Sequence, residues 1–312
     1  MAHAIDKSLK KNDRIALVVK GFCMGIADVI PGISGGTIAF LLGIYENLIA
    51  SIKSLDLSFV QLIFKFRIKE ALDGVAWIFL SCVFGGIILA VFTMSHPLSW
   101  ALEHHPVMIH SFFFGLIVAT VPIIAKILKK WTTVEVVLLL IAAVAAYGIS
   151  QLVPQQTPES AWFIFLCGVI AICAMILPGI SGSFLLLILG KYEYIIASVK
   201  NYDFVTLGVF LLGIVVGITT FARVLSWLFK KYHDITLATL TGLVVGSLSK
   251  IWPWREATSM AIDRHGDIIP LKEIAVLPPQ INGEVFLAIV LMGVGFSLAM
   301  FLSRSGGKLI SE

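Results

Sequence analysis

The chain has 312 residues, of which 58% are hydrophobic and 13% are charged. Soluble globular proteins carry about 25% charged residues, so this composition excludes that class and indicates a membrane protein. The net charge of +4 comes without a basic run interleaved with aromatic residues, which argues against a nucleic-acid-binding surface.

The first predicted elements are two short apolar segments at 15–30 and 36–52, separated by the sequence PGISGG. A continuous helix over both would measure about 57 Å, far more than the roughly 30 Å needed to cross a hydrocarbon core. We therefore expect a re-entrant helical hairpin over about 15–52 that turns at PGISGG and returns. The basic residues up to Arg14 lead into this hairpin and not into a signal-peptide cleavage site.

Longer apolar segments follow, and each is long enough to span a membrane as a helix. In the first half they lie at about 75–95, 107–125 and 134–153. A linker rich in Pro and Gln, 154–160, leads to a second short pair with the turn PGISGS, expected to form a hairpin over about 161–199. The last spanning helices are expected at about 204–229, 235–252 and 284–303.

The two halves are copies of each other. Residues 31–56 and 178–203 match at 14 of 26 positions without a gap, and Leu98-Ser99-Trp100 recurs later as Leu225-Ser226-Trp227. We therefore expect two repeats, residues 1–153 and 161–312, each with one Pro-Gly-broken hairpin and three transmembrane helices. Duplicated broken helices are typical of transporters that bind their substrate near the bilayer midplane.

The expected fold is an all-α polytopic membrane protein with inverted-topology repeats. Each repeat makes an odd number of crossings, so the two must lie antiparallel, with the two PGIS turns close together near the midplane. With the N-terminus inside, 15 of the 23 Lys and Arg residues lie in inside segments, whereas the short outside loops 96–106 and 154–160 carry none. This positive-inside pattern predicts that both termini are cytoplasmic.

The two hairpin turns are the strongest candidates for a binding site. Non-helical backbone at membrane depth persists only where protein buries it or where it lines a polar cavity. The start of a returning helix offers N–H groups and a positive dipole end to an anion, and serine is a natural cap there. A tightly packed structural kink is the alternative. The residues expected to bind substrate are Ser34, Gly35, Gly36, Thr37, Ser181, Gly182, Ser183 and Arg223.

Charged residues inside apolar segments are the second kind of candidate. Arg223 would cost several kcal/mol in the membrane unless paired or hydrated, and its fork suits a phosphate or carboxylate; it could instead reach toward Lys230 or pair with an acid. Glu46 and Glu193 recur at equivalent positions, where they either reach interfacial water or couple transport to a proton or cation. Asp28 has Met175 as its counterpart, so any coupling role it has is asymmetric.

Other reactive residue types have ordinary explanations. Lys20 is expected to extend toward the membrane surface. The cysteines are interpreted as small core residues and the histidines of 96–105 as solvated loop residues, so we expect no metal and no cofactor. The chain has no nucleotide-binding loop, HExxH motif or serine nucleophile elbow, which argues against an enzyme or an ATP-driven pump.

The motif GFCMGIADVIPGISGGTIAFLLGIYENL and its copy ILPGISGSFLLLILGKYEYI resemble the PopT family over essentially the full chain. By this resemblance, the first motif is matched by Asp28, Ser34, Gly35, Gly36, Thr37, Tyr45 and Glu46. The second is matched by Ser181, Gly182, Tyr192 and Glu193. Met175, Ser183 and Phe184 depart from the first motif, so the halves cannot supply identical ligands.

The resemblance implies a flippase for undecaprenyl phosphate in the bacterial cytoplasmic membrane, which recycles the lipid carrier of cell-wall peptidoglycan synthesis. Such a carrier shelters the phosphate head while the tail stays among membrane lipids, so we expect a groove open to lipid and coupling to an ion gradient. The alternatives are a secondary transporter of a small anion and a membrane-embedded enzyme acting on polyprenyl phosphates. Assembly into a homo-oligomer is left open.

Overall fold

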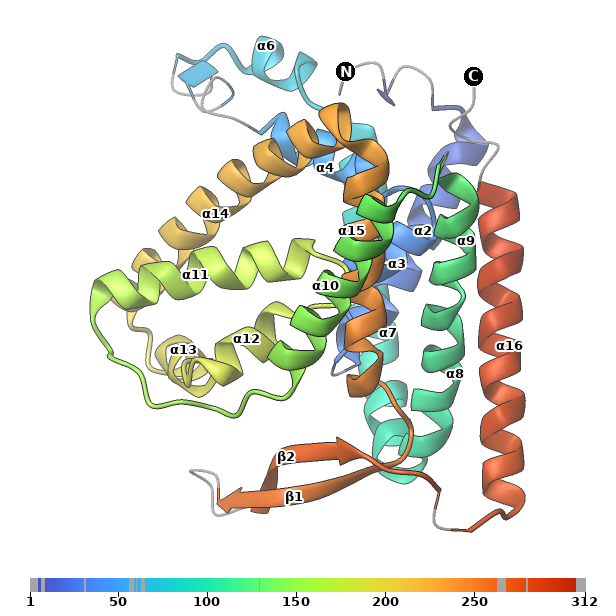
Figure 1. The fold of residues 1–312 in the computed structure, drawn as a ribbon. Coiled ribbons are helices and arrows are strands. Elements are labelled where there is room, and N and C mark those ends of the chain that lie inside the picture. Colours follow the sequence, from blue (N-terminus) through green and yellow to red (C-terminus); the bar gives the residue numbers. More distant parts are fainter. Residues whose placement is uncertain are drawn as a thin grey trace.

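The computed structural model is built almost wholly of helices (Figure 1). It describes residues 5–306 except 7–8, 31, 56–58, 60, 63–64, 129, 263–267 and 279. Pro31, in the first predicted turn, and the extreme ends of the chain therefore lie outside the described residues. Among those described, five helices are long and apolar enough to cross a membrane, or seven if each bent pair counts as one span. The predicted multi-pass helical membrane fold is confirmed.

The elements follow the predicted segments. The first half contains α2 (Lys11–Val29), α3 (Gly35–Leu41), α4 (Tyr45–Lys53), α6 (Ile68–Asp73), α7 (Trp77–His104), α8 (Pro106–Val118), α9 (Thr120–Ile127) and α10 (Thr133–Ser150). The second half contains α11 (Ala161–Ile176), α12 (Gly182–Ile188), α13 (Tyr192–Lys200), α14 (Phe204–Lys231), α15 (His233–Ser247), the 3₁₀ turn η1 (Leu248–Lys250), the strands β1 (Arg255–Ile262) and β2 (Ile268–Ala275), and α16 (Gly283–Gly306).

Each returning arm of the predicted hairpins is two short helices, not one. The helix pair α3–α4 is bent by 119° and the pair α12–α13 by 103°. The bends fall at Gly43 and Gly190, whose φ angles of 69° and 62° lie in the left-handed region that glycine adopts without strain. At seven residues, α3 and α12 are each about 10 Å long, so neither crosses a bilayer alone, and each bent pair is either a broken span or the predicted re-entrant arm.

Two further elements differ from the predictions. The segment predicted as a spanning helix at 235–252 forms the shorter α15, which ends at Ser247 and passes into η1. The segment after it, expected to be a loop, contains the antiparallel hairpin β1–β2. Figure 1 places this hairpin at one end of the molecule, and α6 together with the last turns of α16 at the other.

The helices pair in the same way in both halves. Within each half, the first long helix of the hairpin packs on the first spanning helix, α2 on α7 and α11 on α14. Between halves, α10 packs on α15 and α16 on α8. The backbones approach closely through glycine: a Cβ at Gly115 would lie 1.9 Å from the Met292 carbonyl oxygen, and one at Gly242 would lie 2.2 Å from that of Leu139. Such small-residue contacts are how membrane helices pack without a hydrophobic driving force.

The two hairpins sit in different surroundings. The side chains of α3 and α4 belong to the main buried cluster, which includes Ile38, Phe40 and Ile49. Those of α12 and α13 belong to a smaller cluster formed with α11 and α14. Large apolar side chains, among them Phe92, Val144, Val215 and Phe286, are exposed on the long helices, as expected of helices that face lipid.

Candidate functional site

The turns of the two hairpins are in direct contact. The Ser34 hydroxyl donates to the Met175 carbonyl oxygen at 3.3 Å, and the Gly179 N–H donates to the Thr37 hydroxyl oxygen at 2.8 Å. Ser34 and Thr37 are both buried. The expected approach of the two PGIS turns is therefore observed.

Two backbone N–H groups of the first turn are paired with side chains of the same hairpin. Ser34 caps α3 by accepting from the Gly36 N–H at 3.2 Å, and Asp28 accepts from the Gly35 N–H at 2.6 Å. A Cβ at Gly35 would lie only 2.5 Å from the Asp28 carboxylate, so glycine is needed for this contact. The N–H groups predicted for a substrate anion are thus already paired in this structure.

The second turn lacks this carboxylate. Met175 stands where Asp28 stands in the first repeat, and no side chain caps the N-terminus of α12. The Ser181 hydroxyl lies 2.8 Å from that of Ser183, which is exposed. Gly182 is buried against Ala171, whose carbonyl oxygen would lie 2.5 Å from an added Cβ.

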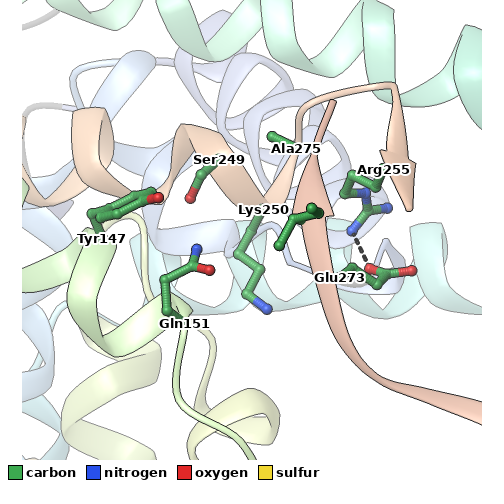
Figure 2. Close-up of a pocket in the computed structure, with 8 residues that line it drawn as sticks. Tyr147, Gln151, Ser249, Lys250, Arg255, Glu273 and Ala275 are labelled. Carbon is green, nitrogen blue, oxygen red and sulfur yellow. Dashed lines mark hydrogen bonds and ion pairs between the residues drawn. The ribbon is translucent and has the colours of Figure 1, made fainter. Parts of the chain in front are cut away.

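A cavity of about 210 Å³ opens beside the second turn. It is bounded by the turn itself, the end of α10, the end of α15 and the strand hairpin, with the lining residues Gly32, Ala146, Ile149, Ser150, Gly179, Ile180, Ser181, Phe184, Leu187, Ser247, Lys250, Arg255 and Glu273. A smaller pocket of about 90 Å³ shares Lys250, Arg255 and Glu273 and adds Tyr147 and Gln151 (Figure 2).

Two cations of this cavity were missed by the sequence predictions. The Lys250 ammonium lies 4.5 Å from the centroid of the Phe184 ring, and the Arg255 guanidinium donates to Glu273 at 3.0 Å. In the sequence both look like ordinary charges of a long loop. Their only signal was position, directly after the helix that packs against the Gly179 turn.

Arg223 is exposed on α14 and does not line the cavity. Within the described part of the chain it forms no hydrogen bond or ion pair with another residue. The structure therefore does not bring it into contact with either turn.

The predicted coupling residues lie at the start of the second short helix of each hairpin. Glu46 contacts His233 at 3.0 Å, and His233 contacts Asp234 at 3.2 Å. Partial burial alone would lower the pKa of His233, but the hydrogen bonds to Asp234 and Glu46 outweigh it and the pKa is raised. Glu193 is exposed at the equivalent position on α13.

Lys20 does not extend to the surface as predicted. It is buried and its ammonium donates to the Leu42 carbonyl oxygen at 3.0 Å, at the end of α3. The first hairpin bends one residue later, and its last helical carbonyls need a donor, which explains the position of this lysine. Lys20 therefore holds the bend of the hairpin in place.

The sequence has clear relatives among known proteins. A family model described as "VCA0040-like: Undecaprenyl phosphate translocase-like" matches residues 24–269. A polyprenyl-phosphate transporter of Vibrio cholerae is 38% identical over 305 residues, covering 96% of this chain and 99% of that protein. A polyprenyl-phosphate transporter of Staphylococcus aureus is 32% identical over 254 residues, covering 76% of this chain and 85% of that protein. No solved structure gives a significant match.

Proposed function

This chain belongs to the undecaprenyl phosphate translocase-like family, and from that membership we propose that it moves undecaprenyl phosphate across the bacterial cytoplasmic membrane. The observation that carries the proposal is the similarity to polyprenyl-phosphate transporters along nearly the whole chain. The family and its relatives are transporters and not enzymes, which agrees with the expectation from the sequence motifs.

The physical problem for such a transporter is the phosphate head. The polyprenyl tail is soluble in lipid, whereas a phosphate taken out of water needs charged or hydrogen-bonding partners. The second turn, with Ser181, Gly182 and Ser183, borders a cavity that contains two cations, and this arrangement supports a head-group site there. Arg223 would meet the head along the exposed face of α14, where the tail can remain among lipids.

Transport requires the site to open to each side in turn, and the two repeats differ in a way that suits this. In the first repeat, Ser34 and Tyr45 bond to carbonyl oxygens at the end of α11. Their counterparts in the second repeat, Ser181 and Tyr192, make no equivalent bonds to α2 among the described residues. In the proposed cycle the first hairpin releases α11 while the second binds α2. The hydroxyls of Ser34 and Thr37 then become available to the head, and the N–H groups of Gly35 and Gly36 follow if Ser34 and Asp28 release them.

An ion gradient is the proposed source of energy. Moving a phosphate inward against a negative-inside potential costs about 2.3 kcal/mol per charge per 100 mV. Glu46, Glu193 and Asp28 are carboxylates of the hairpins. Glu46 also contacts His233, and this contact is an ion pair when the imidazole is protonated. Protonation of such carboxylates would offset the charge of the substrate.

Purified protein in liposomes tests the proposal. We expect the protein to accelerate transbilayer movement of undecaprenyl phosphate, and an imposed ion gradient to drive its accumulation on one side. The same liposomes are assayed for uptake of inorganic phosphate, because a small-anion transporter would move free phosphate and leave the lipid in place. Movement of phosphate without movement of the lipid would contradict the proposal.

A further inference from the structure

The cavity beside the second turn contains the ammonium group of Lys250, which has no acceptor among the residues that the structure describes. Among the described residues, no carboxylate or hydrogen-bond acceptor pairs with the Lys250 side chain, which lies over the Phe184 ring. Figure 2 shows this side chain between Gln151 and the ion pair of Arg255 with Glu273. A cation that faces a cavity without a partner can bind an anion without first breaking an internal bond.

The guanidinium of Arg255 is held by two neighbouring side chains. One N–H group donates to Glu273 at 3.0 Å and another to His110 Nε2 at 2.9 Å. His110 Nδ1 lies 2.7 Å from the Pro106 carbonyl oxygen, which only accepts, so Nδ1 carries the proton and Nε2 the lone pair. A guanidinium has five N–H donors, and these two contacts are the ones that Arg255 makes within the described part of the chain, so it retains donors for a ligand.

Phe184, beside Lys250, is a position at which the two copies of the motif differ. It occupies the position of Thr37 in the duplicated motif, where the first repeat uses a buried hydroxyl to bind the other turn. In the second repeat the aromatic ring instead faces the Lys250 ammonium at 4.5 Å. Where the first repeat has the hydrogen bond between Thr37 and Gly179, the second therefore has a cation–π contact, which positions the Lys250 ammonium beside the cavity.

The charge and size of the cavity define its ligand. Among the described lining residues, Lys250 and Arg255 face one carboxylate, that of Glu273, so positive charges outnumber negative ones. The volume of about 210 Å³ is ample for a phosphate group, and a phosphate monoester carries about −1.5 to −2 charges near pH 7. From these observations we propose that Lys250 and Arg255 bind a phosphate monoester in this cavity and favour its greater charge over the single charge of a phosphodiester.

That the bound phosphate belongs to a lipid rests on the proposed function, whereas phosphate binding by Lys250 and Arg255 does not. The test measures binding of farnesyl phosphate, inorganic phosphate and a sugar phosphodiester of farnesol to the purified full-length protein by calorimetry at fixed ionic strength. Lys250→Gln is expected to weaken farnesyl phosphate binding roughly 10- to 100-fold, the range for a hydrogen bond to a charged group. Lys230→Gln, at an exposed lysine near the end of α14, is the matched control and should bind like the natural protein.

The outcomes separate the two proposals. Equal binding of farnesyl phosphate by Lys250→Gln and the natural protein overturns the site, even if transport is confirmed. Binding of inorganic phosphate but not farnesyl phosphate, lost in Lys250→Gln, supports the site and contradicts the lipid transporter. Equal binding of the sugar phosphodiester overturns the preference for the monoester. Lys250→Arg keeps the charge and should retain most of the affinity; if it loses as much as Lys250→Gln, the charge is not what binds the ligand.

Discussion

The hydroxyl of Tyr45 donates a hydrogen bond to the carbonyl oxygen of Ile176, with 3.0 Å between the two oxygens. Tyr45 begins the second short helix of the first hairpin, whereas Ile176 is the last residue of the helix that leads to the second turn. Because Pro178 and the turn follow, the helix cannot continue to pair this carbonyl. Tyr45 is 2% exposed, but its counterpart Tyr192 is 41% exposed. Of the two equivalent tyrosines, Tyr45 therefore ties its hairpin to the end of α11, whereas Tyr192 is exposed.

Tyr45→Phe should destabilise the protein more than Tyr192→Phe. The first substitution removes the donor and leaves a buried carbonyl oxygen without its partner, which costs about 1–3 kcal/mol. The second removes a hydroxyl from an exposed ring and should change stability by less than about 0.5 kcal/mol. Thermal unfolding of both variants in the same detergent measures the difference, and equal losses would show that the Tyr45 bond is not stabilising.

Gly35→Ala should disrupt the first turn. The added methyl group would lie 2.5 Å from the Asp28 carboxylate, which must then move away from the Gly35 N–H. We expect a loss of stability of about 1–3 kcal/mol together with reduced transport. Gly148→Ala is the control, because an added Cβ there meets no atom within 4 Å. If both variants keep the same stability and transport, the close contact between Gly35 and Asp28 does not stabilise the turn.

Much of the helical fold could be predicted because long apolar segments and an internal duplication are strong signals in a sequence. The bends at Gly43 and Gly190 could not, since a single glycine in an apolar helix is often tolerated and only its φ angle marks a break. The strand hairpin was missed because two short strands in a polar segment resemble a loop. The motif predicted Ser34 and Thr37 as site residues, but it could not predict their partners Met175 and Gly179, which lie in the other repeat.

Lys250 and Arg255 were missed for a related reason. Nothing in the sequence separates a lysine that faces a cavity from one that faces water, and only the packing of α15 against the Gly179 turn brings these residues to the site. Arg223 shows the converse. Its place in an apolar segment predicted a binding role, which stays a prediction: the side chain is exposed on α14 and does not line the cavity.

Arg223 nevertheless has a direct test. If the phosphate head passes along α14, Arg223→Ala should abolish transport while the folded protein is retained, because this exposed side chain pairs with none of the described residues and contributes little to stability. Arg223→Lys should recover little transport, since an ammonium cannot form the two parallel bonds of a guanidinium. Transport is measured in liposomes and folding by size-exclusion profile. Full transport by the alanine variant would remove Arg223 from the mechanism.

The orientation of the chain can be tested with single cysteines at two exposed positions. Gln156 lies in the linker between the repeats and Lys130 in the connection between α9 and α10. The positive-inside pattern predicts that Gln156→Cys is labelled from outside and Lys130→Cys from the cytoplasm. Labelling of intact cells with an impermeant thiol reagent, in a background without the natural cysteines, decides this. Labelling of both from one side would contradict the inverted-repeat topology.

The contact between Glu46 and His233 should make the first hairpin sensitive to pH. Because the pKa of His233 is raised above its ordinary value of 6.5 in the folded protein, the protonated imidazolium is the form that the carboxylates of Glu46 and Asp234 stabilise. The stabilisation is therefore complete below about pH 6.5 and is lost as the pH rises through the raised value. His233→Gln should lower the melting temperature at pH 5.5 and change it much less at pH 9.

Glu46→Gln separates stability from coupling. It removes one of the two carboxylates that face His233, so the pH dependence of the melting temperature should shrink but not vanish, since Asp234 remains. If Glu46 also couples transport, this variant should still exchange undecaprenyl phosphate across liposomes but no longer accumulate it along a proton gradient. Glu193→Gln is the counterpart in the second repeat. Gradient-driven accumulation by both variants would limit Glu46 to its contact with His233.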